Sequence, residues 1–142
     1  MTSTAETNRL RLRIIAQLLG ELGQEVVFVG GATVSLYADT PLAVEVRPTD
    51  DIDIVIELAT YGSYGILDER LRQLGFQNDI MSGVICRYQV SGITVDMMPT
   101  DSSVLGFSNR WYAPGFREAT DYQLDEQTTI RFFTLPYFLA SK

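Results

Sequence analysis

Two hydrophobic periods alternate along about the first hundred residues, and this alternation limits what the chain can fold into. Leucine and isoleucine recur at three- and four-residue steps in residues 8–22 and again in residues 64–74, a spacing typical of amphipathic helices. Runs of apolar residues predict strands at residues 25–29, 51–57, 84–90 and 93–98. Helices and strands in this order predict an α+β domain, with a small mixed sheet and helices on one face.

Turn residues separate these segments. Gly30-Gly31 joins the first strand to residues 32–38, which predict two turns of helix, and Ser91-Gly92 predicts a tight hairpin between the strands on either side. Further along, a strand is predicted at residues 128–133, and the start of a helical segment at residues 135–142. No internal repeat or long linker divides the 142 residues, so we expect a single domain over residues 1–142.

The chain contains no histidine, and its only lysine is Lys142. These absences exclude a histidine-based catalytic triad, a His-ligated zinc site and a P-loop lysine in the body of the chain. The single cysteine, Cys86, excludes an internal disulfide and lies in an apolar stretch, which predicts a small core residue. Carboxylates and backbone dipoles are left as the main catalytic resources.

The formal net charge is −7, from 11 Lys and Arg against 18 Asp and Glu. This sign excludes a protein whose whole surface grips a phosphate backbone, so any contact with nucleic acid should be local. No apolar run reaches the roughly 20 residues that a membrane-spanning helix needs, and the polar N-terminal stretch lacks the hydrophobic centre of a signal peptide. We therefore expect a cytoplasmic protein without membrane contact.

Three aspartates carry the most informative chemistry. Asp51 and Asp53 stand two residues apart in a predicted strand, so they share one face with Cα atoms roughly 7 Å apart. Two carboxylates about 6 Å apart repel each other by roughly 3 kcal/mol at an effective dielectric of about 20, and a divalent cation reverses the sign of that interaction. If the strand of Asp96 pairs beside theirs, three carboxylates converge, as a site with two metal ions requires. Mg²⁺ is the expected ion, with Mn²⁺ as an alternative.

Gly30-Gly31 supplies the complementary half of such a site. Without side chains, the backbone N–H groups at the start of a helix approach phosphate oxygens closely and meet them with the positive end of the helix dipole. The acids would hold metal, and the glycines would hold phosphate.

These residues, in this order, resemble the nucleotidyltransferase superfamily with the DNA polymerase β-like palm fold. The similar segments are Val29-Gly30-Gly31-Ala32-Thr33, Arg47-Pro48-Thr49-Asp50-Asp51-Ile52-Asp53-Ile54 and Thr94-Val95-Asp96. Within the superfamily, the chain is most similar to the AbiEii-type and related minimal nucleotidyltransferases, several of which are toxins of type IV toxin–antitoxin systems. The resemblance spans residues 26–98, about half the chain.

The resemblance implies transfer of a nucleoside monophosphate from a nucleoside triphosphate to a hydroxyl of RNA, tRNA or a protein, with Mg²⁺ as cofactor and an antitoxin as a possible partner. The implied catalytic and metal-binding residues are Asp51, Asp53 and Asp96. The implied nucleotide-binding residues are Gly30, Gly31, Arg47, Thr49 and Lys142.

Two departures from the family pattern change what is expected. Many members carry Gly-Ser where this chain has Gly30-Gly31, so Thr33 or Ser35 would have to supply the missing hydroxyl. Longer relatives continue into a helical region where this chain ends. That difference predicts either a minimal member that needs a partner or a domain that lacks its C-terminal helical region.

Other interpretations stay open at this stage. One is a non-catalytic nucleotide- or metal-binding partner, or a fragment of such an enzyme. Another is a small-molecule nucleotidyltransferase of the aminoglycoside-modifying kind, whose acidic site attracts a cationic antibiotic. The aspartates could also have only a structural role, as residues that introduce a strand after a turn. Trp111, Tyr112 and Phe116 are expected to pack over the edge of a core rather than to stack on a base.

Overall fold

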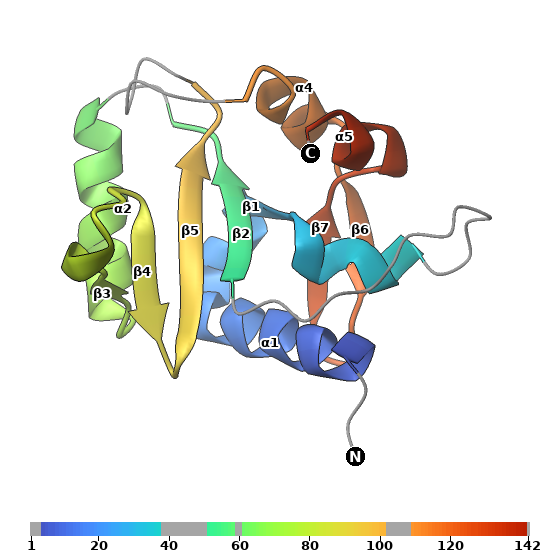
Figure 1. The fold of residues 1–142 in the computed structure, drawn as a ribbon, viewed down its shortest axis with the longest axis horizontal. Coiled ribbons are helices and arrows are strands. Elements are labelled where there is room, and N and C mark those ends of the chain that lie inside the picture. The colour runs from blue at the N-terminus through green and yellow to red at the C-terminus, as the bar shows by residue number, and fades with distance from the viewer. Residues whose placement is uncertain (1–3, 38–50, 59–60, 102–108, 142) are drawn as a thin grey trace.

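The computed structural model describes residues 4–37, 51–58, 61–101 and 109–141 (Figure 1). The helices are α1 (Thr4–Leu19), α2 (Tyr61–Gln73), α4 (Tyr112–Arg117) and α5 (Leu135–Ala140), and the 3₁₀ segments are η1 (Gly20–Glu25), η2 (Gly31–Tyr37) and η3 (Ile80–Ser82). The strands are β1 (Val26–Val29), β2 (Asp51–Ile56), β3 (Gln77–Asn78), β4 (Arg87–Val90), β5 (Ile93–Pro99), β6 (Thr120–Gln123) and β7 (Thr129–Phe132). None of the helices in these ranges has the length and apolar character of a membrane span.

The seven strands form one mixed sheet in the order β3-β4-β5-β2-β1-β7-β6, which confirms the α+β class. At its centre β2 and β5, distant in the sequence, are parallel neighbours, and β1 flanks β2 in the antiparallel direction. The register sets Asp53 opposite Val29 of β1 on one side and opposite Asp96 of β5 on the other. The predicted pairing of the two aspartate-bearing strands is therefore confirmed.

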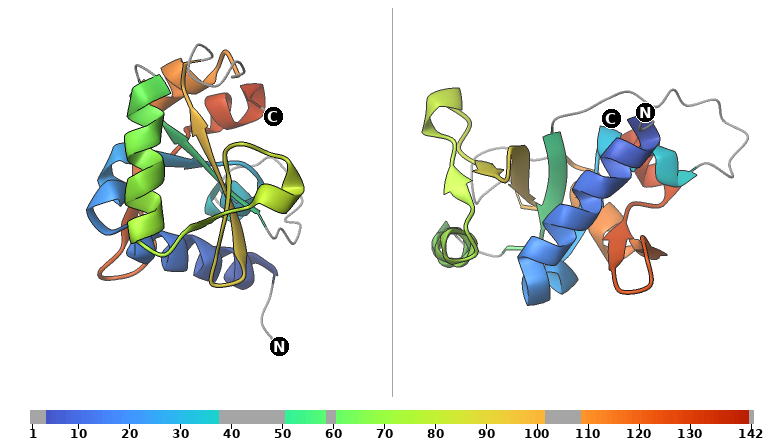
Figure 2. Two further views of the ribbon diagram at one scale, coloured as in Figure 1. Left: turned by 90° about the vertical axis from the view of Figure 1, so that its left-hand side faces the viewer. Right: turned by 90° about the horizontal axis from the view of Figure 1, so that it is seen from below.

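Alternation of side chains along the central strands gives the sheet two different faces. Ile52 and Ile54 point to one face, where they join the larger core under α1, η1 and α2. Asp51, Asp53 and Asp96 occupy the alternate positions and point to the other face. Figure 2 shows α2 and η3 on opposite sides of β4 and β5, so the aspartates share their side of the sheet with η3.

The prediction of helices on one face holds for α1 and α2 but not for α4 and α5. The two short helices cover part of the second face, packing on a smaller buried cluster of Val27, Val29, Val34, Val55, Phe133 and Phe138. The helical segment expected from residue 135 is α5, whereas α4 was missed because six residues are too few for a helical period to be visible in a sequence. Tyr112 and Phe116 pack against this cluster, as expected of them.

The strand predicted at residues 84–90 begins only at Arg87. The preceding apolar residues belong instead to a turn that follows η3, in which Gly83 has φ 74° and its N–H bonds to the carbonyl of Ile80. Ile85 is 65% exposed, so apolar character here does not reflect burial. Cys86 is buried, as predicted, and burial raises the pKa of its thiol to about 11.

A hydrogen-bond network fixes α2 to β4. The hydroxyl of Tyr88, a fully buried residue, donates to Asp68 Oδ1 over 2.6 Å, and Asn78 Nδ2 donates to the same oxygen over 2.8 Å. Arg72 contacts Asp68 Oδ2 over 2.9 Å. Although burial opposes ionisation of Asp68, these donors hold its pKa below the ordinary value.

We expect Tyr88→Phe to lower the free energy of unfolding by about 1 to 2 kcal/mol near neutral pH, because a carboxylate loses a charge-assisted donor. Since the pKa of Asp68 is lower in the folded state, the stabilisation is present above about pH 4 and is lost as the pH falls through the folded pKa. Urea denaturation between about pH 3 and pH 7 should show the gap to the wild type narrowing toward acid. A gap that does not change with pH would contradict this account.

Candidate functional site

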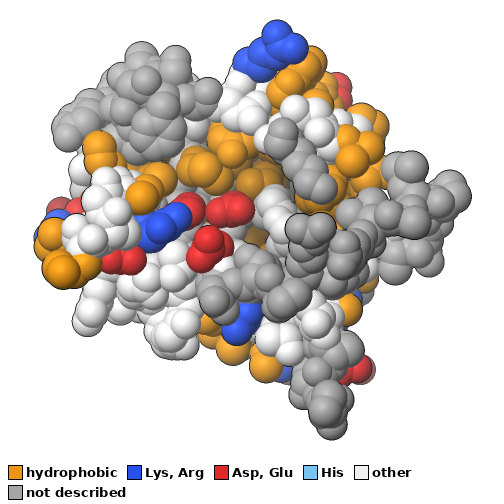
Figure 3. Space-filling model, viewed as in Figure 1, with side chains coloured by type: hydrophobic (Ala, Val, Ile, Leu, Met, Phe, Trp, Pro, Cys, Tyr) orange, Lys and Arg blue, Asp and Glu red, His pale blue; other side chains and the backbone are white. Residues whose placement is uncertain are grey.

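An acidic cluster, formed by Asp51, Asp53 and Asp96, lies where β2 and β5 run side by side. Asp53 and Asp96 are directly paired in the parallel register, and Asp51 begins β2 on the same face. Figure 3 shows acidic side chains gathered over these strands, next to basic side-chain atoms and beside a patch of apolar side chains. The structure thus places the three predicted aspartates on one face of neighbouring strands.

The environment of Asp53 disfavours its ionised form. Its position between β1 and β5 removes much of its hydration, and this burial is the main reason why its pKa rises to about 6. The charges of Asp96 and Asp51 raise the pKa further, and the charge of Arg87 offsets part of the effect. The mutual repulsion expected from the sequence is therefore present at this site, and it is only partly compensated.

Gly30 is required where β1 leaves the sheet. Its φ of +79° lies in the left-handed region, and a Cβ atom at this position would come within 2.3 Å of Asp53 Oδ2. Gly31 is different, since its φ is not positive, a Cβ there meets nothing within 4 Å, and the residue is exposed. The absence of a side chain at Gly30 allows the backbone to run close to the carboxylate of Asp53. At Gly31 the backbone is exposed to solvent beside the acidic cluster.

Of the two residues expected to supply the missing hydroxyl, Thr33 does not point it toward the acidic cluster. The residue is fully buried, and its Oγ1 donates to the carbonyl of Gly30 over 2.8 Å, so it stabilises the turn after β1. The helix expected after the glycines is the 3₁₀ segment η2, whose seven residues give little dipole. Ser35 is half-buried, and the exposed backbone at Gly31 is the better candidate for phosphate contact.

Arg87 is a residue that the sequence prediction missed. It lies on β4 directly opposite Asp96, where its Nε donates to Oδ1 over 2.8 Å and its Nη2 donates to Oδ2 over 3.1 Å. The side chains of Arg87 and Asp96 are only 27% and 13% exposed, so the ion pair is partly shielded from water. The hairpin turn carried the missing signal, because counting outward from Ser91-Gly92 places these two residues opposite each other.

The carboxylates of Asp51, Asp53 and Asp96 are of the chemical type that binds a divalent cation, although Arg87 competes for Asp96. Carboxylate oxygens are the ligands that Mg²⁺ prefers, and the raised pKa of Asp53 marks a place where added positive charge is favourable. Over the described ranges, no three side chains of the His, Cys, Asp or Glu type stand ready as a ligand group. Both oxygens of Asp96 accept a hydrogen bond from Arg87, so a cation that joins Asp51, Asp53 and Asp96 has to compete with that guanidinium.

Three of the predicted nucleotide-binding residues, Arg47, Thr49 and Lys142, lie outside the described residues. On the described side of the site, Tyr112 of α4 directs its hydroxyl to the sulfur of Met98 over 3.5 Å. Burial raises the pKa of Tyr112, and the charge of Asp53 adds to the rise. Tyr112 therefore lies near the acidic cluster as part of its apolar border.

Comparison with known proteins adds no relative. No protein-family model matches the chain, and a search of curated proteins finds no match either. The residues and geometry of the site are therefore what point to a function.

Proposed function

We propose that the protein is a Mg²⁺-dependent nucleotidyltransferase of the polymerase β-like type, which transfers a nucleoside monophosphate from a nucleoside triphosphate to a hydroxyl acceptor. The register of the central strands is the observation that carries the proposal. Asp53 stands between Asp96 on one side and Val29, which leads into Gly30-Gly31, on the other. Carboxylates suited to metal and open backbone suited to phosphate thus adjoin each other.

Each residue has a definite task in this proposal. Asp51 and Asp53 hold the cation, which when bound offsets the negative charge of the triphosphate and of the reaction centre. The open backbone at Gly31 receives the phosphates. Asp96 lies on β5, across β2 from the glycines, and in this proposal it accepts the proton of the acceptor hydroxyl. The acceptor oxygen then forms a bond to the α-phosphorus, the bond to the β-phosphate bridge breaks, and pyrophosphate leaves with the electron pair.

The similarity to AbiEii-type toxins extends the proposal to the acceptor and the partner. RNA, tRNA or a protein is the proposed acceptor, and an antitoxin is the proposed partner. Because the net charge is −7, an RNA acceptor would have to be held by a local patch rather than by the whole surface.

Radiolabelled nucleoside triphosphates, supplied singly with Mg²⁺ and with total tRNA or a protein mixture, test the proposal. We expect label to appear in one class of acceptor and to be lost in the double variant Asp51→Asn with Asp53→Asn. If the wild type neither binds nor transfers any nucleotide, or if the double variant transfers as well as the wild type, the proposal is wrong.

The Arg87–Asp96 ion pair favours a second candidate, a non-catalytic subunit that binds nucleotide or metal. Because Asp96 is held in a bidentate contact, an acceptor hydroxyl would have to compete with the guanidinium of Arg87 for this carboxylate. Mg²⁺-dependent nucleotide binding without turnover would support this candidate. Repeated turnovers by the isolated 142-residue chain would reject it.

A further inference from the structure

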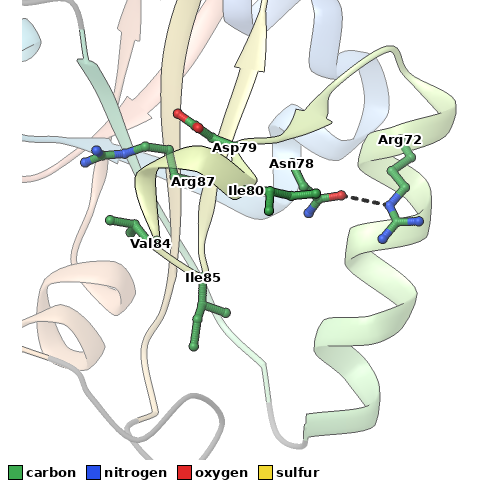
Figure 4. Close-up of a pocket in the computed structure, with 8 residues that line it drawn as sticks. Arg72, Asn78, Asp79, Ile80, Val84, Ile85 and Arg87 are labelled. Carbon is green, nitrogen blue, oxygen red and sulfur yellow. Dashed lines mark hydrogen bonds between the residues drawn. The ribbon is translucent and has the colours of Figure 1, made fainter.

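Arg87 stands between the acidic cluster and a neighbouring pocket. The pocket has a volume of about 370 Å³ and lies between η3 and β4, with Arg72, Asn78, Asp79, Ile80, Val84 and Arg87 among its lining residues. In Figure 4 the guanidinium of Arg87 points away from Arg72 and Asn78, which lie on the α2 side of the pocket. The side chain of Arg87 therefore lines the pocket and also hydrogen-bonds the carboxylate of Asp96.

Carboxylates of the acidic cluster and of the pocket both favour the cationic form of Arg87. The hydrogen bonds and charge of Asp96 raise the pKa of Arg87 above its ordinary value, and the charges of Asp51 and Asp79 add to this effect. One guanidinium among three carboxylates leaves a local charge of about −2, whereas a divalent cation in its place would leave about −1. A divalent cation therefore compensates the acidic cluster better than Arg87 does.

We infer that Arg87 is a built-in counter-ion of the acidic cluster, and that a divalent cation engages Asp96 only by displacing Arg87 toward the pocket. The inference rests on the proposed function in one respect, since that function is what calls for the cation. Its structural basis is the bidentate contact, at 2.8 and 3.1 Å, which uses both oxygens of Asp96. The guanidinium takes the lone pairs that face β4, one on each oxygen, and its charge repels a cation at the same carboxylate, so Arg87 and a metal compete for Asp96.

The pocket offers Arg87 a second partner after displacement. Asp79 lies at its wall, and its carboxylate already accepts hydrogen bonds from Ser82 N over 3.1 Å and from Gln89 Nε2 over 2.9 Å. Its charge acts on Arg87 even in the present position. Because the side chain of Arg87 is already 27% exposed, leaving Asp96 would not bury an unpaired charge.

Titration of the full chain with Mn²⁺ alone, followed by calorimetry, tests the inference. Arg87→Met removes the competing cation while keeping much of the side-chain length. Arg70→Met is the matched control, since Arg70 pairs with Glu25 over 3.3 Å outside the cluster and its loss changes the net charge equally. We expect Arg87→Met to bind Mn²⁺ about tenfold more tightly than the wild type and Arg70→Met to bind as the wild type does. In the absence of metal, Arg87→Met should melt at a lower temperature and recover more on addition of Mn²⁺.

The outcomes separate this inference from the proposed function. If Arg87→Met binds Mn²⁺ no more tightly than the wild type does, Arg87 is a purely structural residue and the inference is overturned, while the proposed function is unaffected. If neither protein binds Mn²⁺, both are overturned. Arg87→Lys covers the case in which Arg87→Met does not fold, because lysine keeps the charge but cannot form the bidentate contact. Its Mn²⁺ affinity should exceed that of the wild type by a smaller factor, and an unchanged affinity would overturn the inference.

Discussion

Gly30→Ala should lower the free energy of unfolding by about 2 to 5 kcal/mol and remove nucleotide binding, whereas Gly31→Ala should leave the fold unchanged. Two costs add at Gly30. A side chain at φ +79° is strained by about 1 to 2 kcal/mol, and a Cβ atom 2.3 Å from Asp53 Oδ2 forces the carboxylate or the strand to move, at about 1 to 3 kcal/mol. At Gly31 neither cost arises, because the φ angle is ordinary and the space is open.

Urea denaturation of the two variants measures this difference directly, and the chemical change is the same in both. Binding of a nucleoside triphosphate in the presence of Mg²⁺ supplies a second measurement. Gly31→Ala should fold normally and yet bind nucleotide more weakly, because its methyl group would stand where backbone meets phosphate in the proposed site. Equal destabilisation by the two substitutions would show that the close approach of Gly30 to Asp53 does not matter energetically.

Sequence patterns predicted the centre of the sheet well because two signals agree there. In β2 the alternation of Asp51, Ile52, Asp53 and Ile54 fixes both the strand and its two faces, since a shift of one residue would bury both acids. Asp96 shows the same alternation in β5, between two buried neighbours. The alternation in each strand thus predicts which side chains face away from the core. Parallel pairing of the two strands then brings the aspartates side by side.

The parts that were not predicted depend on which partner a side chain meets rather than on the spacing of apolar residues. An arginine at position 87 has many acidic partners available in a sequence with 18 acidic residues, and only the register of the hairpin selects Asp96. The hydroxyl of Thr33 could face either phosphate or its own backbone, and the turn after β1 decides in favour of the backbone. The apolar pair Val84-Ile85 looks like a strand because composition does not record exposure.

Asp53→Asn should make the protein more stable and inactive at the same time. The pKa of Asp53 is about 6 in the folded state, above the ordinary value of 3.8, so the folded state binds a proton more readily than the unfolded chain does. The stability of the wild type should therefore fall as the pH rises from about 4 to about 6 and stay lower above that range. An asparagine carries no charge, so the variant should lack this fall and gain roughly 1 to 3 kcal/mol near neutral pH.

Thermal or urea denaturation at about pH 4 and pH 8 measures the predicted difference between the two proteins. The gap should be small at the acidic end, where Asp53 is protonated in the folded protein and about half protonated in the unfolded chain, and largest at the alkaline end. Asp121→Asn is the matched control, an exposed aspartate on β6 where the same change should leave stability and its pH dependence unaltered. Lower stability of Asp53→Asn at pH 8 would mean that the carboxylate is held by favourable contacts and that the repulsion is misjudged.

A substitution that raises stability but lowers activity distinguishes a functional carboxylate from a structural one. A structural aspartate, such as Asp68 in its network of donors, should cost stability when it is replaced. Asp53 is repelled by Asp96 and Asp51, so the fold gains when its charge is removed. If its charge is kept for metal and nucleotide, transfer activity should fall roughly a hundredfold or more in Asp53→Asn, and Mg²⁺ should raise the melting temperature of the wild type but not of the variant. A stabilised variant with undiminished transfer activity would separate the acidic cluster from the reaction.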